Sequence, residues 1–405
     1  MVQAGCNVAA IGPSALEISA GYGSLLECGL LLGAGIINID EYGLGGRSGL
    51  QCAAIEGRTA VVEYLIDRGA DINLPASPVD RERRLTALQA AALGGHTETV
   101  DSLIEAGANC QAPANTNGLI TLLEAAAGPG AWTANHVPLN WKVSREVIFK
   151  KLLARSESGT INRTDGTDST VLHRLIRTAP IQCLDLALRA GARTEDRNPV
   201  DRMTPLQYAA RFGKFDAMEL LIKYNANINA PAADKSKHGR TALQAVLEDP
   251  FLAKIIAFLL IHGAEVNAPP AEVGGITALQ GAAIRGDVQV ARMLIARGAN
   301  VNAPPALRDG RTALEGAAEH GRLGMVQFLL KNGAVPDLSK GFGTAIKLAE
   351  NRERFDIADL LRREQGPAYT NLFNNLSDQL AWNPEPHMPE LGTVMDNDDQ
   401  DEMVI

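Results

Sequence analysis

Residues that could perform catalysis or hold a metal are present, but their spacing does not bring them together. The sequence contains none of the patterns HExxH, G-x-S-x-G, GxxxxGKS/T or CxxC, which place catalytic or ligating groups side by side. The seven histidines are His96, His136, His173, His238, His262, His320 and His387, and the five cysteines are Cys6, Cys28, Cys52, Cys110 and Cys183. We therefore expect no catalysis, no metal site and no cofactor, and we expect unpaired thiols in a reducing compartment. A catalytic set assembled between distant segments stays open, because a search for linear patterns does not reveal it.

One glycine-rich stretch resembles a phosphate-binding loop only superficially. Residues 43–49 read GLGGRSG and lack the lysine and the spacing of that motif. We expect a flexible hairpin loop there.

Basic and tryptophan residues are the candidates for binding another protein. They are Arg81, Arg83 and Arg84 in one loop, Lys235, Lys237 and Arg240 in a second, Arg308 and Arg311 in a third, and Trp132 and Trp141 in an insertion. Basic clusters aligned on one face would favour an acidic partner segment, and their attraction would weaken with salt. The alternatives are that the basic loops are only solvated and that the two indoles cover a gap between helices.

The elements that position these residues are copies of one unit, which is clearest in Thr277–Asn302. Thr277 is suited to cap a short helix that ends at Gly286, and a second helix runs from 288 to 297 and ends at Gly298. Residues 300–305 then form an extended loop, because they contain two prolines. Neither helix can bury its apolar side alone, so the copies must stack.

The same residues return at the same places along the chain. The opening Ser or Thr occurs at Ser14, Ser48, Thr86, Thr121, Thr170, Thr204, Thr241, Thr277, Thr312 and Thr344. A glycine follows nine residues later at Gly23, Gly57, Gly95, Gly213, Gly286 and Gly321, and another twenty-one residues later at Gly35, Gly69, Gly107, Gly298 and Gly333. The sequence predicts an all-α solenoid of about nine to ten helix–turn–helix units with projecting hairpin loops.

These units resemble ankyrin repeats. TPLQYAARFG (204–213), TALQAAALGGH (86–96) and LIDRGADIN (65–73) carry the family pattern, and the likeness covers residues 14–365. The family's histidine is replaced by glutamine at Gln51, Gln89, Gln207, Gln244 and Gln280, whereas His173 retains it. Glutamine has both donors and an acceptor, so it can still tie the hairpin loop to the helix start. The TALQAA and VNAPPA phrases are similar to long ankyrin arrays of filamentous fungi.

The resemblance implies an intracellular protein–protein interaction scaffold or adaptor that binds its partner on a concave surface. First helices and hairpin ends line that surface in the family. Two alternatives stay open. The chain could be the regulatory repeat region of a longer fungal protein with an N-terminal DNA- or nucleotide-binding effector domain. It could also serve a specialised biosynthetic pathway, as an accessory protein or as an enzyme with a cleft in the irregular region 121–165.

Composition and pattern changes divide the chain into six parts. Residues 1–13 resemble the remnant of a preceding repeat or an N-terminal cap, 14–120 are repeats, 121–165 are an irregular repeat with an insertion, and 166–365 are repeats again. An amphipathic helix is expected over 366–382, followed by an acidic disordered tail over 383–405. The last forty residues hold eight acidic residues and no Lys or Arg. The rest of the chain therefore has 38 basic and 39 acidic residues.

A nearly neutral body gives no reason to expect direct binding of nucleic acid. We find no secretory signal and no apolar run long enough for a membrane, and expect a soluble monomer in the cytoplasm or nucleus.

Overall fold

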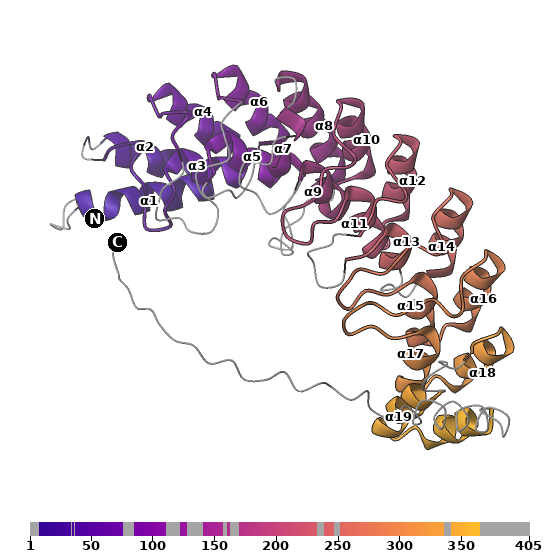
Figure 1. Ribbon diagram of the computed structural model, residues 1–405. Helices are drawn as coiled ribbons and strands as arrows, with labels where there is room; N and C mark the ends of the chain where they lie inside the picture. The colour runs from indigo at the N-terminus through magenta and orange to yellow at the C-terminus, as the bar shows by residue number, and fades with distance from the viewer. Residues whose placement is uncertain are drawn as a thin grey trace, which may run out of the picture.

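The computed structural model describes most of the chain. The described residues are 8–33, 35, 37–75, 85–110, 122–127, 141–156, 160–162, 170–232, 239–246, 252–335 and 342–364. Their helices pair and stack into a curved solenoid, with the first helix of each pair along the inner, concave side and the second along the outer side (Figure 1). Within this part of the chain, strand-type pairing is limited to one bridge between Val273 and Arg308. The predicted all-α solenoid is confirmed.

The helices are as follows. The inner helices are α1 (Val8–Tyr22), α3 (Gly49–Ile55), α5 (Ala87–Gly94), α7 (Leu122–Ala127), α9 (Val171–Thr178), α11 (Pro205–Arg211), α13 (Ala242–Ala245), α15 (Ala278–Arg285), α17 (Ala313–Glu319) and α19 (Gly343–Asn351). The outer helices are α2 (Leu25–Gly33), α4 (Thr59–Asp67), α6 (Thr97–Glu105), α8 (Trp141–Arg155), α10 (Ile181–Arg189), α12 (Phe215–Lys223), α14 (Leu252–Ile261), α16 (Val288–Ala296) and α18 (Leu323–Lys331). A helical stretch over 355–364 follows α19, and η2 (Thr160–Asn162) is a single 3-10 turn.

The predicted opening residues are helix N-caps in most units. The side-chain oxygens of Ser48, Thr86, Thr170, Thr204, Thr241, Thr277 and Thr312 each accept a hydrogen bond from the backbone N–H three residues later. The prediction was wrong at both ends of the array. Ser14 lies inside α1, which begins at Val8, and its Oγ accepts from Leu44 N at 3.0 Å. Thr344 lies in the first turn of α19, which follows Phe342 without a side-chain cap. Thr121 is outside the described residues.

The glutamine that replaces histidine ties each unit to the loop that follows it. Gln280 Oε1 accepts from Thr277 N at 2.8 Å, and its Nε2 donates to the carbonyls of Ala303 and Pro304 at 3.2 and 2.9 Å. The same double role occurs at Gln51, Gln207 and Gln244. His173 does it with its ring, since Nε2 contacts Met203 O at 3.0 Å and Nδ1 lies 2.6 Å from Thr170 Oγ1. The predicted link between loop and helix start is confirmed.

The core forms both within helix pairs and between neighbouring pairs. Positions two, five and six after the cap are 0–2 % exposed in well-formed units, as in Leu50, Ala53, Ala54, Leu88, Ala91, Ala92, Leu206, Ala209, Ala210, Leu279, Ala282 and Ala283. These residues belong to one hydrophobic cluster that runs along the whole described array. Alanine at two of the three positions lets neighbouring inner helices approach closely.

The irregular unit keeps the stack continuous. Helix α7 packs against α5 and α9, and α8 packs against α6 and α10. Arg145 of α8 is buried and donates to Leu93 O at 2.7 Å and to the carbonyls of Ala125 and Ala126 at 3.4 and 3.3 Å. Burial lowers the pKa of its guanidinium to about 10, so it stays charged at neutral pH.

The six-part division of the chain stays a prediction. Helix α1 begins inside the segment expected to be a remnant. The amphipathic helix expected over 366–382 and the tail over 383–405 lie outside the described residues.

Gly298→Val should lower the free energy of unfolding by about 1–3 kcal/mol. Gly298 has φ +86, and a Cβ there would meet no atom within 4 Å, so the cost is one of backbone conformation alone. Asn225 occupies the matching place after α12 with φ +61, which makes Gly298→Asn the matched control with a smaller loss. Urea unfolding followed by circular dichroism measures both, and equal stability of the Val variant and the wild type would contradict the argument.

Stability should fall in acid because of His173. Burial lowers the pKa of this imidazole from 6.5 to about 4. Between these values the unfolded chain binds the proton and the folded chain does not, so the free energy of unfolding falls as the pH drops and levels off below 4. The loss is on the order of 3 kcal/mol.

In His173→Gln this acid loss should disappear, because glutamine fills the same place in other units without titrating. Urea unfolding at a series of pH values gives the difference between wild type and variant, with the values above pH 7 as the baseline. A difference that does not change with pH would disprove the role of His173.

Candidate partner-binding surface

The inner helices leave one stripe of side chains open on the concave side. Positions four and eight after the cap lie one turn apart on the same face. Position four is buried in several units, as in Ala90 and Ala245, whereas position eight is half-buried in Gly94 and exposed in Phe212 and Arg285. In several units the stripe holds small residues, such as Ala90 and Gly94 on α5 or Gly281 on α15. Helices α9 and α11 bring Arg174, Tyr208 and Phe212 to these positions, and Phe212 is an exposed aromatic residue among them.

Arg174, Tyr208, Arg211 and Phe212 form what we call the concave cluster. The rings of Tyr208 and Phe212 lie 4.6 Å apart, and Phe212 is 46 % exposed although it is aromatic. The Arg211 guanidinium lies 5.8 Å from the Phe212 ring centroid and 3.6 Å from Asp201. An exposed phenylalanine beside an arginine is suited to contact an apolar side chain flanked by a carboxylate.

The neighbouring His173 supports this cluster without adding charge. Its ring meets the Tyr208 ring edge-on at 5.2 Å, and its lowered pKa keeps it neutral. The link between Thr170, His173 and Met203 therefore fixes the position of Tyr208 from below.

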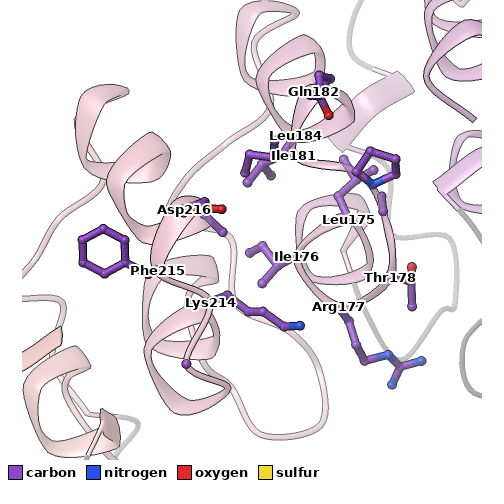
Figure 2. Close-up of a pocket in the computed structure, with 14 residues that line it drawn as sticks. Leu175, Ile176, Arg177, Thr178, Ile181, Gln182, Leu184, Lys214, Phe215 and Asp216 are labelled. Atoms are coloured by element: carbon purple, nitrogen blue, oxygen red, sulfur yellow. The ribbon is translucent and has the colours of Figure 1, made fainter. Parts of the chain in front are cut away.

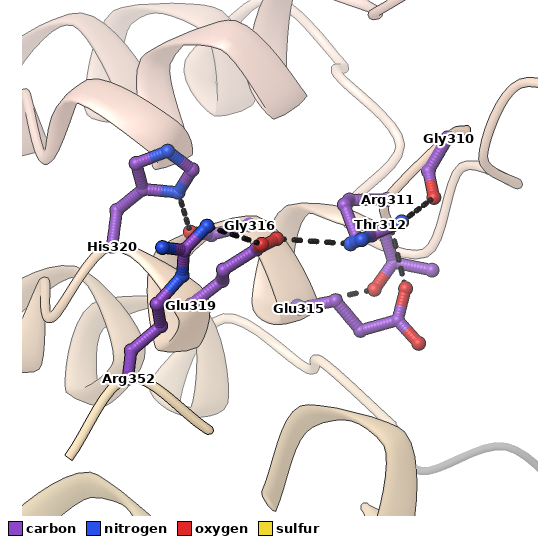
Figure 3. A network of polar contacts seen from close by, with 8 residues as sticks. All are labelled: Gly310, Arg311, Thr312, Glu315, Gly316, Glu319, His320 and Arg352. Carbon is purple, nitrogen blue, oxygen red and sulfur yellow. Dashed lines mark hydrogen bonds and ion pairs between the residues drawn. The ribbon is translucent and has the colours of Figure 1, made fainter. Parts of the chain in front are cut away.

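The two predicted arginines of the third loop are engaged in ion pairs. Arg308 is exposed and lies 2.9 Å from Glu272 of the preceding loop. Arg311 lies 2.9 Å from Glu319, whose other oxygen is 3.6 Å from Arg352 (Figure 3). Both arginines stand where a partner could reach them, and their contact with one stays a prediction.

Arg240 is a structural residue of its loop. It is only 7 % exposed, and it donates to Gly239 O at 3.2 Å and to Gly274 O at 3.5 Å in the next loop. The expectation of a solvated loop residue is wrong here, because the following loop covers the side chain. A contact with a partner through Arg240 stays a prediction that its burial disfavours.

The remaining predicted contacts cannot be placed. Arg81, Arg83, Arg84, Trp132, Lys235 and Lys237 lie outside the described residues. Trp141 begins α8, but its side chain is not among those described.

Sequence reasoning missed two kinds of residue. Aliphatic side chains stand at the ends of hairpin loops, where Leu44 is 93 %, Leu307 81 % and Val200 66 % exposed. An apolar residue amid glycine and charged residues was the available signal. Sequence reasoning also missed Tyr208 and Phe212. Aromatic residues make up only 4 % of the sequence, so their rarity was an available signal.

The surface offers recognition chemistry, and the described residues hold few groups suited to reaction. Burial raises the pKa of the Cys52 thiol to about 11 and of the Cys183 thiol to about 12, which disfavours the reactive thiolate. No group of three or more His, Cys, Asp or Glu within the described part is arranged to hold a metal ion. Of the helices described, none has the length and apolarity needed to cross a bilayer.

Comparison with known proteins identifies the family. A model for ankyrin repeats in three copies matches residues 139–232, 172–270 and 244–340, and a model for the single ankyrin repeat matches 45–77 and 83–115. The chain belongs to the ankyrin-repeat family, as its resemblance predicted. Ankyrin repeats form protein–protein interaction modules, and this chain is such a module.

Individual relatives are distant. A transient receptor potential cation channel subfamily A member 1 homolog from Caenorhabditis elegans is 33 % identical over 98 residues, which are 24 % of this chain and 7 % of that protein. The chain thus matches only a small fraction of the length of this relative.

Two solved structures are similar. The human ASB11 ankyrin repeat domain is 24 % identical with a TM-score of 0.48, covering 63 % of this chain and 99 % of that one. A chain from the complex of the predatory endopeptidase Bd0816 of Bdellovibrio bacteriovorus with the immunity protein Bd3460 is 23 % identical with a TM-score of 0.41, covering 52 % and 97 %.

Proposed function

We propose that this protein is a non-enzymatic, intracellular adaptor that binds a protein partner through the concave cluster. The observation that supports this is the exposed Phe212, which packs on Tyr208 and has the Arg211 guanidinium beside its ring. We propose the cytoplasm or the nucleus as its location and a monomer as its state.

The partner segment that fits this cluster has an apolar side chain flanked by acidic residues. Burying the exposed part of Phe212 gains free energy from the hydrophobic effect, and the arginines supply charged donors to carboxylates. Aromatic and arginine side chains dominate the energetics of most protein interfaces, because they combine area with directional bonds. Four or five neighbouring units can supply an interface of about 1,600 Å².

A second candidate is that the array acts as a regulatory region within a larger assembly. Helices α1 and α2 expose a continuous apolar surface, with Tyr22 79 %, Leu26 75 % and Leu30 67 % exposed. Such a surface is typical of an interface. Leu26→Asp/Leu30→Asp would then lose a partner that Phe212→Ala retains.

Phe212→Ala should reduce recovery of the partner about tenfold, since loss of a hot-spot aromatic side chain costs 1–2 kcal/mol or more. The measurement is affinity purification of the tagged full chain from its host cells, with mass spectrometry. Phe355→Ala is the matched control, because Phe355 is 60 % exposed in the second helix of its unit and lies off the stripe.

Equal recovery with Phe212→Ala and wild type, at unchanged melting temperature, would refute the concave cluster as the binding site. The variant Arg81→Glu/Arg83→Glu/Arg84→Glu tests the predicted loop cluster separately. Unchanged recovery in that variant would remove the basic-loop expectation.

A further inference from the structure

The turns between inner and outer helices are connected from unit to unit by long side chains. Arg58 Nε donates to Gly21 O at 3.0 Å, and Arg322 Nε donates to Ile284 O at 3.2 Å. His96 Nε2 lies 3.0 Å from Ile55 O. In these cases a side chain of one unit closes the space beside the turn of the preceding unit. We call such a contact a turn bridge.

The turn bridge is missing between the units of α9–α10 and α11–α12. The turn after α9 reads Thr178-Ala179-Pro180, and Ala179 is extended with φ −96 and ψ 160 instead of being a left-handed glycine. The next unit has Lys214 at the place of Arg58, His96 and Arg322. Within the described part of the chain, the Lys214 side chain has no hydrogen bond or ion pair, and Lys214 is exposed. An open groove of about 700 Å³ lies here, which we call the turn groove (Figure 2).

The turn groove combines an apolar wall with two cations. The wall consists of Leu175, Ile176, Ile181, Leu184 and Phe215. Arg177 and Lys214 are exposed at its edge and have no ion pair within the described part of the chain, and Asp216 is the acidic residue beside them. Its volume is within the range of about 300–1,000 Å³ that ligand sites occupy. A ligand with carboxylates next to aliphatic side chains fits both features.

We propose that the turn groove binds residues 396–405 of the same chain. This segment reads DNDDQDEMVI, so five acidic residues are followed directly by Met403, Val404 and Ile405. The carboxylates would face Arg177 and Lys214, and the aliphatic residues would pack on the apolar wall. The excess acid of the whole chain is concentrated in its last forty residues, which makes this segment the best match in charge that the chain contains.

The segment can reach the groove. Forty-one residues follow Glu364, and an extended chain spans about 3.3 Å per residue, or roughly 130 Å in all. Helix α9 lies five inner helices before α19, which is about 40–50 Å at the usual separation of packed helices. A tethered ligand has an effective concentration on the order of 1 mM, so a weak contact suffices for occupancy.

The turn groove is separate from the concave cluster, since neither Phe212 nor Tyr208 lines it. The two proposals can therefore fail independently. Phe212→Ala leaves the groove intact, and changes at the groove edge leave the concave stripe intact.

Photo-crosslinking in the full chain tests the occupant of the groove. Gln182 is exposed on the groove wall, and benzoylphenylalanine in its place should crosslink to a peptide within 383–405. Gln289 is the matched control, because it is also exposed and also the second residue of its outer helix, beside a turn that Arg322 bridges. We expect about tenfold more crosslink to 383–405 from position 182 than from 289, measured by mass spectrometry of the dilute monomer.

Charge variants then separate specific binding from chance contact. Arg177→Glu/Lys214→Glu should lower the crosslink from position 182 about fivefold, as should added salt. Arg292→Glu/Lys331→Glu, which changes the same charges beside α16 and α18, should leave it unchanged. Equal yields from positions 182 and 289, no crosslink to 383–405, or a crosslink only to a second copy or another protein would each overturn the proposal.

Discussion

The fold depends on a side chain, present in five described units, that joins the start of its own helix to the loop that follows. Glutamine at the third position of the inner helix accepts from the N–H of its own cap and donates to carbonyls of the following loop. In one unit His173 makes the link instead, with Nδ1 on the cap hydroxyl of Thr170 and Nε2 on Met203 O. The glutamine side chains are buried, where an unmade hydrogen bond costs about 1–3 kcal/mol. A helix start and the next loop therefore form together. Asparagines make similar links between loops. Asn229 Nδ2 donates to Gly263 O, and its Oδ1 accepts from Glu265 N. Cooperation between neighbours replaces the globular core that thin helix pairs lack.

These demands leave only certain positions free to vary. The cap, the glutamine and the positions two, five and six after the cap are committed to the stack, whereas positions four and eight face the concave side. The concave cluster arises where those free positions hold Arg174, Tyr208 and Phe212. The turn groove arises for the opposite reason, because Ala179 and Pro180 depart from the glycine turn that other units share. In such an array, binding sites are therefore expected in units that depart from the common pattern but keep the committed positions.

The committed positions are also those that the sequence predicts well. Caps at Thr204 or Thr277 and left-handed glycines such as Gly286 follow from local rules, and the structure has them. The rules failed at Ser14, which lies inside α1, and at Thr344, which lies in the first turn of α19. The exposure of individual side chains was harder to predict from the sequence. Arg240 donates to a carbonyl 34 residues later in the next loop, and Phe212 is 46 % exposed although it packs on Tyr208, so neither result is readable from the surrounding sequence. The concave cluster was missed for this reason.

Exposure also decides how much free energy each predicted arginine could contribute to binding a partner. The Arg308–Glu272 pair is 66 % and 52 % exposed on its two side chains, and such pairs contribute about 0–1 kcal/mol. A partner carboxylate can replace Glu272 at little cost. Arg311 is different, because Glu319 is only 14 % exposed and is shared with Arg352, so withdrawing Arg311 would leave a carboxylate half-paired beneath the surface. Of the two, Arg308 is the better contact residue, and it stands next to Leu307, which gives that loop end the same pairing of apolar and cationic groups as the concave cluster.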